Sequence, residues 1–334
     1  MTSNRGETKI KPGVPAPAMA GRLGGAIGER GGVEYRELRA AGLLNRFNTR
    51  TRPMPFGWTA NPYRGCEMGC RYCYARYTHE FLGENNPWQF ERRVYVKNAE
   101  PAALVTELTR ARRSGLLVAI GAATDPYQPG EARFGVTRRV LEAARAAPGV
   151  RLSITTKSAL VARDAGLLAD LARRSEVSVN FSITTLDTGL ARRLEPRAPR
   201  PDLRLAAMRA LTRAGVPTAL FLMPVLPYLT DDEAGLRAVL GAARDAGAGS
   251  AVWNVLFLRA GTREFFLEFL AAEFPGLVPG YRGLYAGSAY AARAYVARVE
   301  ARVARLAEAA AFPGRRRCDR TPDAPADRQL TLVW

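Results

Sequence analysis

Short apolar runs rich in β-branched residues alternate with amphipathic stretches over most of the middle of the chain. Strands are predicted over residues 58–61, 116–122, 150–156, 177–185, 216–223 and 251–258. Helices are predicted over residues 102–114, 137–147, 159–174 and 202–214, and from about residues 230 and 262. Strands that alternate with helices indicate a parallel sheet with right-handed crossovers. Six such units predict an α/β fold, a partial TIM-type (β/α)6 barrel, with a flat doubly wound sheet as the alternative.

The chain is predicted to divide into four parts. Residues 1–33 are rich in glycine, proline and polar residues without apolar periodicity, which predicts disorder. Residues 34–275 form the partial barrel, residues 276–312 a C-terminal helical extension, and residues 313–334 a linker that ends in an apolar motif. Within the extension, an Ala/Arg-rich amphipathic helix is predicted over residues 283–311. Thr230 and Glu233 have the spacing of a capping box, which predicts that a barrel helix starts there.

The chain is strongly basic, with 49 Lys and Arg against 31 Asp and Glu and a net charge of +18. Such a charge favours a polyanionic partner, nucleic acid first, because phosphates release counterions when Lys or Arg binds them. The alternative is a basic surface that only aids solubility. Four of the basic residues are lysines, namely Lys9, Lys11, Lys97 and Lys157. A lysine in a structured segment is therefore notable, since lysine and arginine differ in hydration and donor geometry.

Features of secreted and membrane proteins are missing from the sequence. No apolar run reaches the roughly 18 residues of a membrane span. The N-terminal residues contain no hydrophobic segment after their charges, unlike a signal peptide. We therefore expect a cytoplasmic protein with no membrane partner, in which thiols remain reduced.

Three of the four cysteines, Cys66, Cys70 and Cys73, fall within eight residues with the spacing C-x3-C-x2-C. Thiolates are the usual ligands of iron–sulfur clusters. Three cysteines this close can bind three corners of one cluster and leave the fourth iron open. The alternative is a Cys3His zinc site that includes His79, the only histidine. Cys318 lies in the predicted linker and is expected to be an incidental thiol.

Polar residues follow several of the predicted strands, where a barrel of this type places its chemistry. Strand 116–122 is followed by Thr124 and Asp125, and by Tyr127, Gln128 and Glu131. Strand 150–156 is followed by Lys157 and Ser158. Along strand 177–185, Asn180, Ser182 and Thr184 share one face, and Glu195 and Arg197 come after it. Each has an ordinary role in turns or caps as its alternative, but together they favour a ligand site inside the barrel.

The cysteine pattern, with the aromatic Tyr72 before the last cysteine, resembles the hallmark of the radical S-adenosylmethionine (SAM) superfamily. The segments TDPYQPGE, TTKSAL-x3-RD, SITTLD and EPRAP-x-P extend the resemblance from about residue 33 to residue 274. Together they look like the spore photoproduct lyase B-like branch, whose members are often labelled DNA repair photolyases.

The resemblance implies a [4Fe–4S] cluster on the three cysteines, with SAM bound to the open iron. One electron, from a donor such as a flavodoxin or ferredoxin, then cleaves SAM to a 5′-deoxyadenosyl radical that abstracts hydrogen. By position, the resemblance implies that Tyr72 lies near the adenine and that Thr124 and Asp125 approach the SAM amino group. Lys157 and Ser182 would contact the carboxylate or the ribose.

One departure from the family pattern concerns hydrogen return. Spore photoproduct lyases carry a cysteine in the loop after the second strand, where this chain has Ala123, Thr124 and Asp125. Direct reversal of spore photoproduct by that route is therefore not expected, and Tyr127 or Tyr72 is the alternative hydrogen donor. The expected function is a radical SAM enzyme acting on DNA or another nucleic acid. The alternatives are a radical SAM enzyme acting on a small molecule or peptide, and a non-catalytic, metal-containing nucleic-acid-binding protein.

The last six residues resemble the peptides by which bacterial proteins bind the DNA polymerase sliding clamp. Gln329, Leu330, Leu332 and Trp334 supply the glutamine, the two leucines and the aromatic residue, with Val333 as a departure that moves the aromatic one place late. Such a tail would fold on contact with an apolar pocket. The alternative is a short terminal strand that packs on the domain.

Clamp binding predicts that removal of residues 329–334 abolishes recovery of the protein by an immobilised sliding clamp. The loss is expected because the two leucines and Trp334 supply the apolar contacts. Pulldown with purified clamp measures it, and equal recovery of the full-length and truncated proteins would exclude this partner.

Overall fold

The computed structural model describes residues 21–47, 54–259 and 261–312. Its larger sheet has seven strands in the order β11-β10-β9-β8-β7-β4-β3. They are β3 (Leu44–Arg46), β4 (Trp58–Ala60), β7 (Val118–Ile120), β8 (Arg151–Thr156), β9 (Glu176–Ser182), β10 (Thr218–Val225) and β11 (Ser250–Val255). β3 is antiparallel to β4, and every other pair in this sheet is parallel. The six predicted strands are thus confirmed, each with ends within three residues of the prediction.

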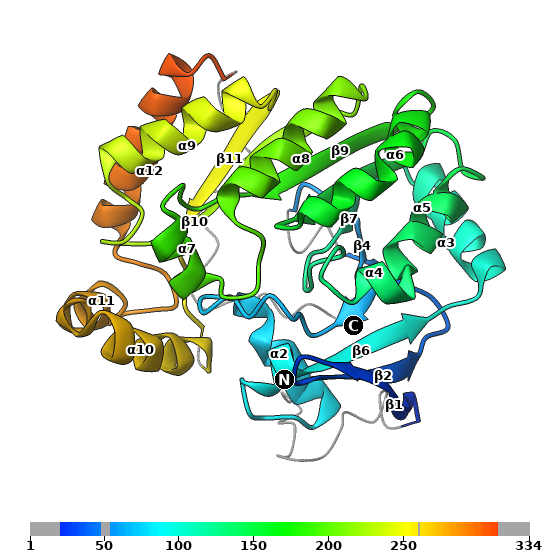
Figure 1. The fold of residues 1–334 in the computed structure, drawn as a ribbon, viewed down its shortest axis with the longest axis horizontal. Coiled ribbons are helices and arrows are strands. Elements are labelled where there is room, and N and C mark those ends of the chain that lie inside the picture. Colours follow the sequence, from blue (N-terminus) through cyan, green and yellow to red (C-terminus); the bar gives the residue numbers. More distant parts are fainter. Residues whose placement is uncertain (1–20, 48–53, 260, 313–334) are drawn as a thin grey trace, which may run out of the picture.

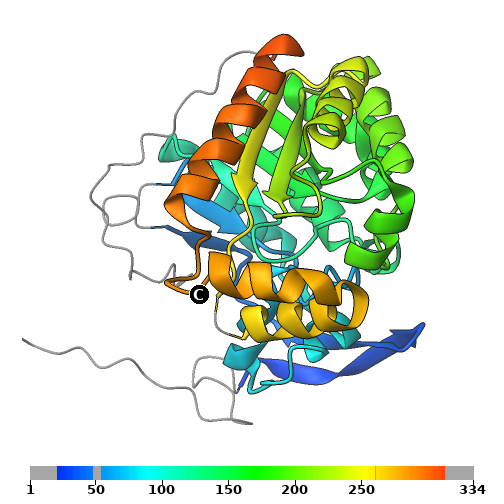
Figure 2. The same cartoon turned by 90° about the vertical axis from the view of Figure 1, so that its left-hand side faces the viewer.

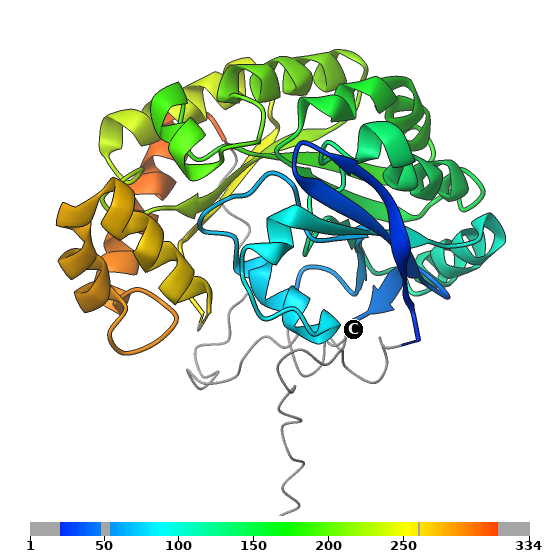
Figure 3. The ribbon, with the colours of Figure 1, turned by 60° about the horizontal axis from the view of Figure 1, so that its bottom comes forward.

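Helices cover the outer face of this sheet, as the arc in Figure 3 shows. They are α3 (Pro101–Arg113), α5 (Val136–Ala144), α6 (Ala165–Ala172), α8 (Pro201–Arg213) and α9 (Glu233–Asp245), and a 3-10 helix η2 (Ala159–Asp164) precedes α6. Apolar strand residues such as Val179 and Phe181 are fully buried in one core with Leu168 and Met208 of these helices. The sheet stays open, with β3 and β11 at its edges, which confirms the partial (β/α) barrel.

The inner face of the sheet is polar where the sequence predicted it. Asn180 on β9 donates hydrogen bonds to Ser153 Oγ at 2.8 Å and to Thr155 Oγ1 at 3.3 Å, both on the adjacent strand β8. Because these groups satisfy one another, the interior can remain polar without an unpaired donor on Asn180. Polar side chains therefore line the strand ends.

A second sheet has the order β1-β2-β6-β5, with β1 (Leu23–Arg30), β2 (Val33–Arg39), β5 (Tyr63–Arg64) and β6 (Arg93–Asn98). The prediction of disorder over residues 1–33 is wrong for β1. Gly31 and Gly32 both have positive φ, of 55° and 73°, and form the two-residue turn of a β-hairpin. β1 is held by the backbone ladder to β2 and buries little apolar surface, so apolar periodicity missed it. Residues 1–20 lie outside the described residues.

The C-terminal part begins with α10 (Thr262–Glu273), followed by η3 (Pro275–Leu277), α11 (Val278–Leu284) and α12 (Arg293–Ala309). The single helix predicted over residues 283–311 is therefore interrupted. Tyr290 in the interruption forms an antiparallel bridge with Phe257, and Ala292 N donates to Leu284 O at 3.0 Å. Figure 2 shows α12 running along the edge of the sheet, where it packs on α9 and β11. The domain boundaries at residues 275 and 312 stay predictions.

The start of α9 also differs from the prediction. Asp232 caps the helix, and its carboxylate accepts a hydrogen bond from Gly235 N at 2.7 Å. Thr230 Oγ1 instead accepts a bond from Leu226 N at 2.8 Å and so closes the preceding turn. The predicted capping box of Thr230 and Glu233 is therefore wrong. Across the described ranges, no helix is both long enough and apolar enough to cross a membrane.

Candidate functional site

The cysteine loop, residues 65–73, connects β5 to the 3-10 helix η1 (Tyr74–Leu82). Cys66 and Cys70 are each 8% exposed, Cys73 is half-buried, and all three are free thiols. Burial, together with the nearby Asp125 and the other two thiols, raises the pKa of Cys66 well above its usual value. Burial also raises the pKa of Cys70 to about 12. The three thiols therefore lie near one another in a setting that disfavours thiolates unless a positive charge binds them.

Glycine gives the loop its close approach to the neighbouring backbone. Gly65 has φ +83°, and a Cβ there would lie 2.6 Å from Arg93 O. Cys66 N donates to Phe90 O at 2.8 Å, and Arg76 donates to Cys70 O at 3.0 Å. The backbone on both sides of the thiols is thus held by residues that follow the loop.

The segment after β7 holds the cysteine loop from another side. Thr124 Oγ1 donates to Gly65 O at 2.6 Å, and Gln128 Nε2 donates to the same oxygen at 3.2 Å. Gln128 Oε1 accepts from Glu67 N at 3.0 Å, and the Glu67 carboxylate accepts from Gly130 N at 2.7 Å. Of the predicted SAM-binding residues, Thr124 is therefore also a support of the loop itself.

Asp125 lies between the ends of β7 and β8. Its carboxylate accepts bonds from Thr156 Oγ1 and from Lys157 N, each at 2.7 Å, and from Tyr127 N at 2.9 Å. Burial raises the pKa of Asp125, although these hydrogen bonds favour the ionised form. The carboxylate also acts electrostatically on Cys66. Asp125 is therefore fixed beside the cysteine loop, and its contact with SAM stays a prediction.

Lys157 and Tyr72 meet next to Cys70. The Lys157 ammonium lies 5.6 Å from the centre of the Tyr72 ring, within cation–π range. Burial lowers the pKa of Lys157, but the charges of Cys70 and Glu195 outweigh it and raise that pKa overall. Two predicted SAM contacts therefore come from different elements to one place.

A buried ion pair lies beneath Tyr72. The Tyr72 hydroxyl donates to Glu195, which is paired with Arg204, and the side chains of both ion-pair residues are 1% exposed. Burial would raise the pKa of Glu195, yet Arg204 and Lys157 hold it below its usual value. Arg204 also donates to Ser182 O at 2.9 Å and to Pro199 O at 2.8 Å. Ser182, the last predicted SAM-binding residue, is thereby fixed at the end of β9.

Sequence reasoning missed Arg204, the buried partner of Glu195. It lies in the first turns of α8, seven places after Arg197, and looks like one of many surface arginines.

Two predicted alternatives do not match the geometry. His79 Nε2 is 2.9 Å from Arg93 O, its ring packs on Phe90 and Tyr95, and burial lowers its pKa to about 4. It supports the backbone rather than the thiols. Tyr127, proposed as a hydrogen donor, is fully buried and donates to Asp164 at 3.1 Å.

Cys318 lies outside the described residues.

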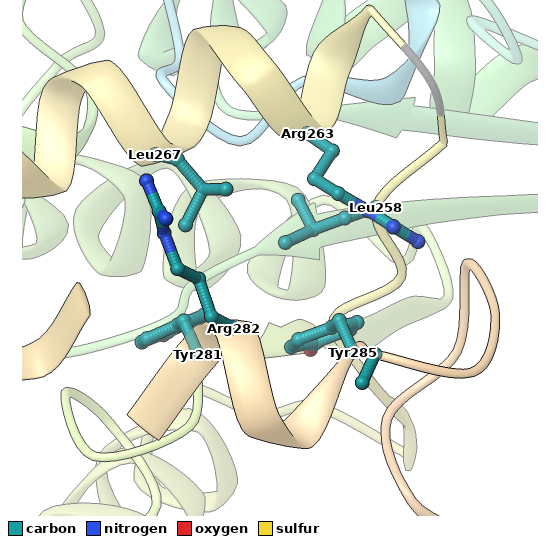
Figure 4. Close-up of a pocket in the computed structure, with 7 residues that line it drawn as sticks. Leu258, Arg263, Leu267, Tyr281, Arg282 and Tyr285 are labelled. Carbon is teal, nitrogen blue, oxygen red and sulfur yellow. The ribbon is translucent and has the colours of Figure 1, made fainter. Parts of the chain in front are cut away.

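A separate cavity of about 100 Å³ lies between α10 and α11 (Figure 4). Its tyrosines are engaged, because Tyr281 donates to Pro227 O at 2.6 Å and Tyr285 donates to Leu256 O at 2.7 Å. None of the cysteines or predicted SAM contacts lines it. The cavity is a packing feature of the C-terminal helices.

The chemistry of the cysteine loop fits an iron–sulfur cluster. The three thiols, two buried and one half-buried, have raised pKa values and require a cationic metal to persist as thiolates, and a cluster supplies that charge. The positive φ of Gly65 and Gly69 keeps the loop backbone free of Cβ atoms at two tight positions. The donor set therefore suits a cluster held at three corners.

A family model described as the radical SAM superfamily matches residues 60–237. The chain belongs to this superfamily. It is therefore a radical SAM enzyme, and the family implies a [4Fe–4S] cluster and SAM as its cofactors.

Relatives span most of the chain. An uncharacterized protein of Mycobacterium tuberculosis is 38% identical over 302 residues, which cover 90% of this chain and 87% of that protein. An uncharacterized protein of Methanocaldococcus jannaschii is 29% identical over 178 residues, which cover 53% of this chain and 63% of that protein.

Solved structures of spore photoproduct lyase share the fold. A mutant with dinucleoside spore photoproduct has a TM-score of 0.60 and 18% identity, and the match covers 83% of this chain and 80% of that one. Another mutant, with bound AdoMet and dinucleoside spore photoproduct, has a TM-score of 0.61 and 16% identity, with the same coverage. At this identity the likeness shows the shared fold.

Replacement of any one cysteine of the loop by alanine is expected to abolish the cluster. The three cysteines bind three of the four irons, and the fourth iron has no cysteine ligand. Loss of one cysteine would leave a second iron without a protein ligand. Cys66→Ala, Cys70→Ala and Cys73→Ala should each give a colourless protein after anaerobic reconstitution, while Cys318→Ala stays brown. Visible absorbance and iron content measure this. If a loop variant keeps its full iron content, the replaced cysteine is not a ligand of the cluster.

The buried pair of Glu195 and Arg204 predicts a strong coupling in stability. Glu195→Gln or Arg204→Met leaves one buried charge without its partner, at a cost of about 3–5 kcal/mol. The double variant should lose at least about 1 kcal/mol less than the two single losses added together. Anaerobic urea denaturation measures the free energies, with Arg200→Met as the surface control, because Arg200 pairs with the exposed Asp202. Additive losses would show that the pair is not coupled.

Proposed function

We propose that this enzyme uses Cys66, Cys70 and Cys73 to hold a [4Fe–4S] cluster and acts on DNA or another nucleic acid. Bound together, cluster and SAM supply a 5′-deoxyadenosyl radical that abstracts hydrogen from a substrate. The observation that carries the proposal is the meeting of Tyr72 and Lys157 beside Cys70, with Asp125 beside Cys66. A carboxylate, of Asp125, and an ammonium group, of Lys157, are thus available near the thiols for the amino and carboxylate groups of SAM.

The amino-acid part of SAM carries a carboxylate and an ammonium group. The predicted contacts include a side chain of opposite charge for each of these two groups. The Lys157 ammonium is a donor for a carboxylate, and the Asp125 carboxylate is an acceptor for an ammonium group. The partly buried setting strengthens both interactions, because few water molecules compete. Tyr72 offers a ring face next to Lys157 for an adenine, and Ser182 offers a hydroxyl at the end of β9.

The nucleic-acid part of the proposal is supported by charge. The chain carries a net charge of +18, and many arginines, such as Arg192 and Arg200, lie on the surface. Basic charge of this size attracts phosphates over long distances. Reversal of spore photoproduct through a returning cysteine is not proposed, since Ala123, Thr124 and Asp125 occupy the loop after β7. A sliding clamp as partner stays a prediction, because residues 329–334 lie outside the described residues.

We also propose a cytoplasmic location. Three free thiols next to one another persist only where thiols are kept reduced, and an oxidising compartment would favour disulfides among them. A protein electron donor is proposed for the same compartment.

The reconstituted protein is expected to convert SAM to 5′-deoxyadenosine under anaerobic conditions with dithionite. Single-stranded DNA, duplex DNA and RNA are added separately, and the correct nucleic acid should raise the rate at least about tenfold, since bound substrate orients the reacting groups. Chromatography of 5′-deoxyadenosine and deuterium transfer from labelled substrate measure it.

Three outcomes separate the candidate functions. Cleavage that no nucleic acid stimulates would favour a small-molecule or peptide substrate. Nucleic-acid binding without any cleavage would indicate a non-catalytic protein. A Lys157→Met variant that cleaves SAM with an unchanged KM for SAM would remove Lys157 from the SAM site.

A further inference from the structure

An exposed tryptophan surrounded by arginines lies on the outer side of the cysteine loop. Trp88 is 37% exposed and directly precedes the short helix α2 (Gln89–Arg92). The guanidinium groups of Arg71 and Arg92 lie 5.0 Å and 5.8 Å from its ring centre, and Phe265 packs edge-on against it at 4.8 Å. We call Arg71, Trp88, Arg92 and Arg197 the Trp88 surface.

This surface is attached directly to the cysteine loop. Arg71 follows Cys70 in the chain, and Phe90, two places after Trp88, accepts the hydrogen bond of Cys66 N. Arg76 donates both to Cys70 O at 3.0 Å and to Pro87 O at 2.8 Å. A single layer of protein therefore separates the thiols from the Trp88 surface.

Arg197 joins the surface through two contacts. Its backbone N–H donates to Met68 O at 3.2 Å, within the cysteine loop, and its guanidinium donates to Glu91 O at 3.3 Å, within α2. The side chain is nevertheless exposed. Its charge is thus held near Trp88 and remains accessible from outside.

The Trp88 surface carries an excess of positive charge. Glu91 is shared by Arg71, at 3.3 Å, and the buried Arg76. In the part of the chain that the structure describes, neither Arg92 nor Arg197 forms an ion pair. Arg92 also lines a groove of about 630 Å³ together with Glu29 and Glu34. Glu34 is paired there with Arg36 and Arg93.

The predicted SAM contacts lie on another side of the loop. Asp125 and Lys157 follow β7 and β8, and Figure 1 shows those strand ends above the cysteine loop and α2 below it. A substrate that meets a radical formed from SAM must come from the side of the strand ends. The Trp88 surface therefore lies close to the thiols without lying on the substrate's side.

We propose that the Trp88 surface is the docking site of an acidic, low-potential electron-transfer protein, a flavodoxin or a ferredoxin. The inference rests on the proposed function, since only a cluster needs this electron. One electron passes from the reduced donor to the oxidised cluster, so that the donor is oxidised by one electron and the cluster is reduced by one. No atom or proton is transferred.

The size and charge of the surface suit this partner. Electron-transfer complexes are small and weak, with less than about 1,200 Å² of interface, and they rely on complementary charge for fast encounter. Three arginines around one tryptophan match an acidic patch on such a donor. Nucleic acid, the competing polyanion, is expected at the strand ends, where its reacting atoms would meet SAM.

Charge reversal at Arg92 tests the docking site. Arg92 contacts the Trp88 ring and is exposed, so Arg92→Glu should leave the fold intact, and Arg92→Glu/Arg197→Glu should enlarge the effect. The control is Arg113→Glu. Arg113 is an exposed arginine that also lies in the last turn of its helix, but α3 leads into the start of β7, at the other end of the strands.

Reconstituted wild-type and variant proteins are mixed anaerobically with the hydroquinone of a purified bacterial flavodoxin, and cluster reduction is followed by stopped-flow absorbance. Titration calorimetry with oxidised flavodoxin gives the Kd. Arg92→Glu should slow reduction and weaken binding about tenfold at low salt, with a smaller difference at high salt. Arg113→Glu should behave as the wild type, and dithionite should reduce the cluster of the wild type and of every variant equally.

Equal reduction of Arg92→Glu and the wild type by flavodoxin would overturn the docking site, and so would loss of nucleic-acid binding in Arg92→Glu with flavodoxin reduction intact. Failure of dithionite to reduce the wild-type cluster would instead overturn the proposed function, and the docking site with it. The Kd for oxidised flavodoxin measures docking alone, because no electron is transferred in that experiment. A slower reduction with an unchanged Kd would contradict a binding role for Arg92.

Discussion

The buried ion pair of Glu195 and Arg204 determines how the cysteine loop sits on the barrel. Transfer of two charges from water into the interior costs several kcal/mol per ion, so such a pair is favourable only when further hydrogen bonds surround it. Here Tyr72 donates to the carboxylate, and Arg204 donates to two carbonyl oxygens, of Ser182 and Pro199. One pair therefore joins the cysteine loop, the end of β9 and the segment before α8. It thereby connects elements that carry Tyr72 and Ser182, two of the predicted SAM contacts.

The same pair sets the charge around Cys70. Burial lowers the pKa of Lys157, whereas the thiol of Cys70 and the carboxylates of Glu195 and Asp125 raise it. Thiolates bound to iron would add negative charge next to it, so the lysine is stabilised further when the loop carries its cluster. The thiols in turn have raised pKa values without metal. Lysine and thiolates thus favour each other's charged forms.

The strands and the thiol ligands were accessible from the sequence because each leaves a local signal. β8, β9 and β10 are buried and therefore apolar, and metal ligands on one loop must be close in the chain. β1 left no such signal, since a backbone ladder and the turn at Gly31 and Gly32 hold it. Arg204 left none either, because its burial depends on a partner nine residues earlier and arginine is common throughout this chain. Residues whose role depends on tertiary contacts alone could not be identified from local pattern.

Net charge alone does not distinguish a nucleic-acid surface from a docking site for an acidic protein, since both partners are polyanions. Position relative to the cysteine loop separates them. Arg71 and Arg92 lie on the Trp88 ring, one layer of protein from Cys66, while Asp125 and Lys157 lie at the strand ends. A one-electron donor needs closeness to the cluster and no access to SAM, whereas a substrate needs access to SAM. The cysteine loop, which lies between the two sides, can therefore serve both partners at once without competition for one surface.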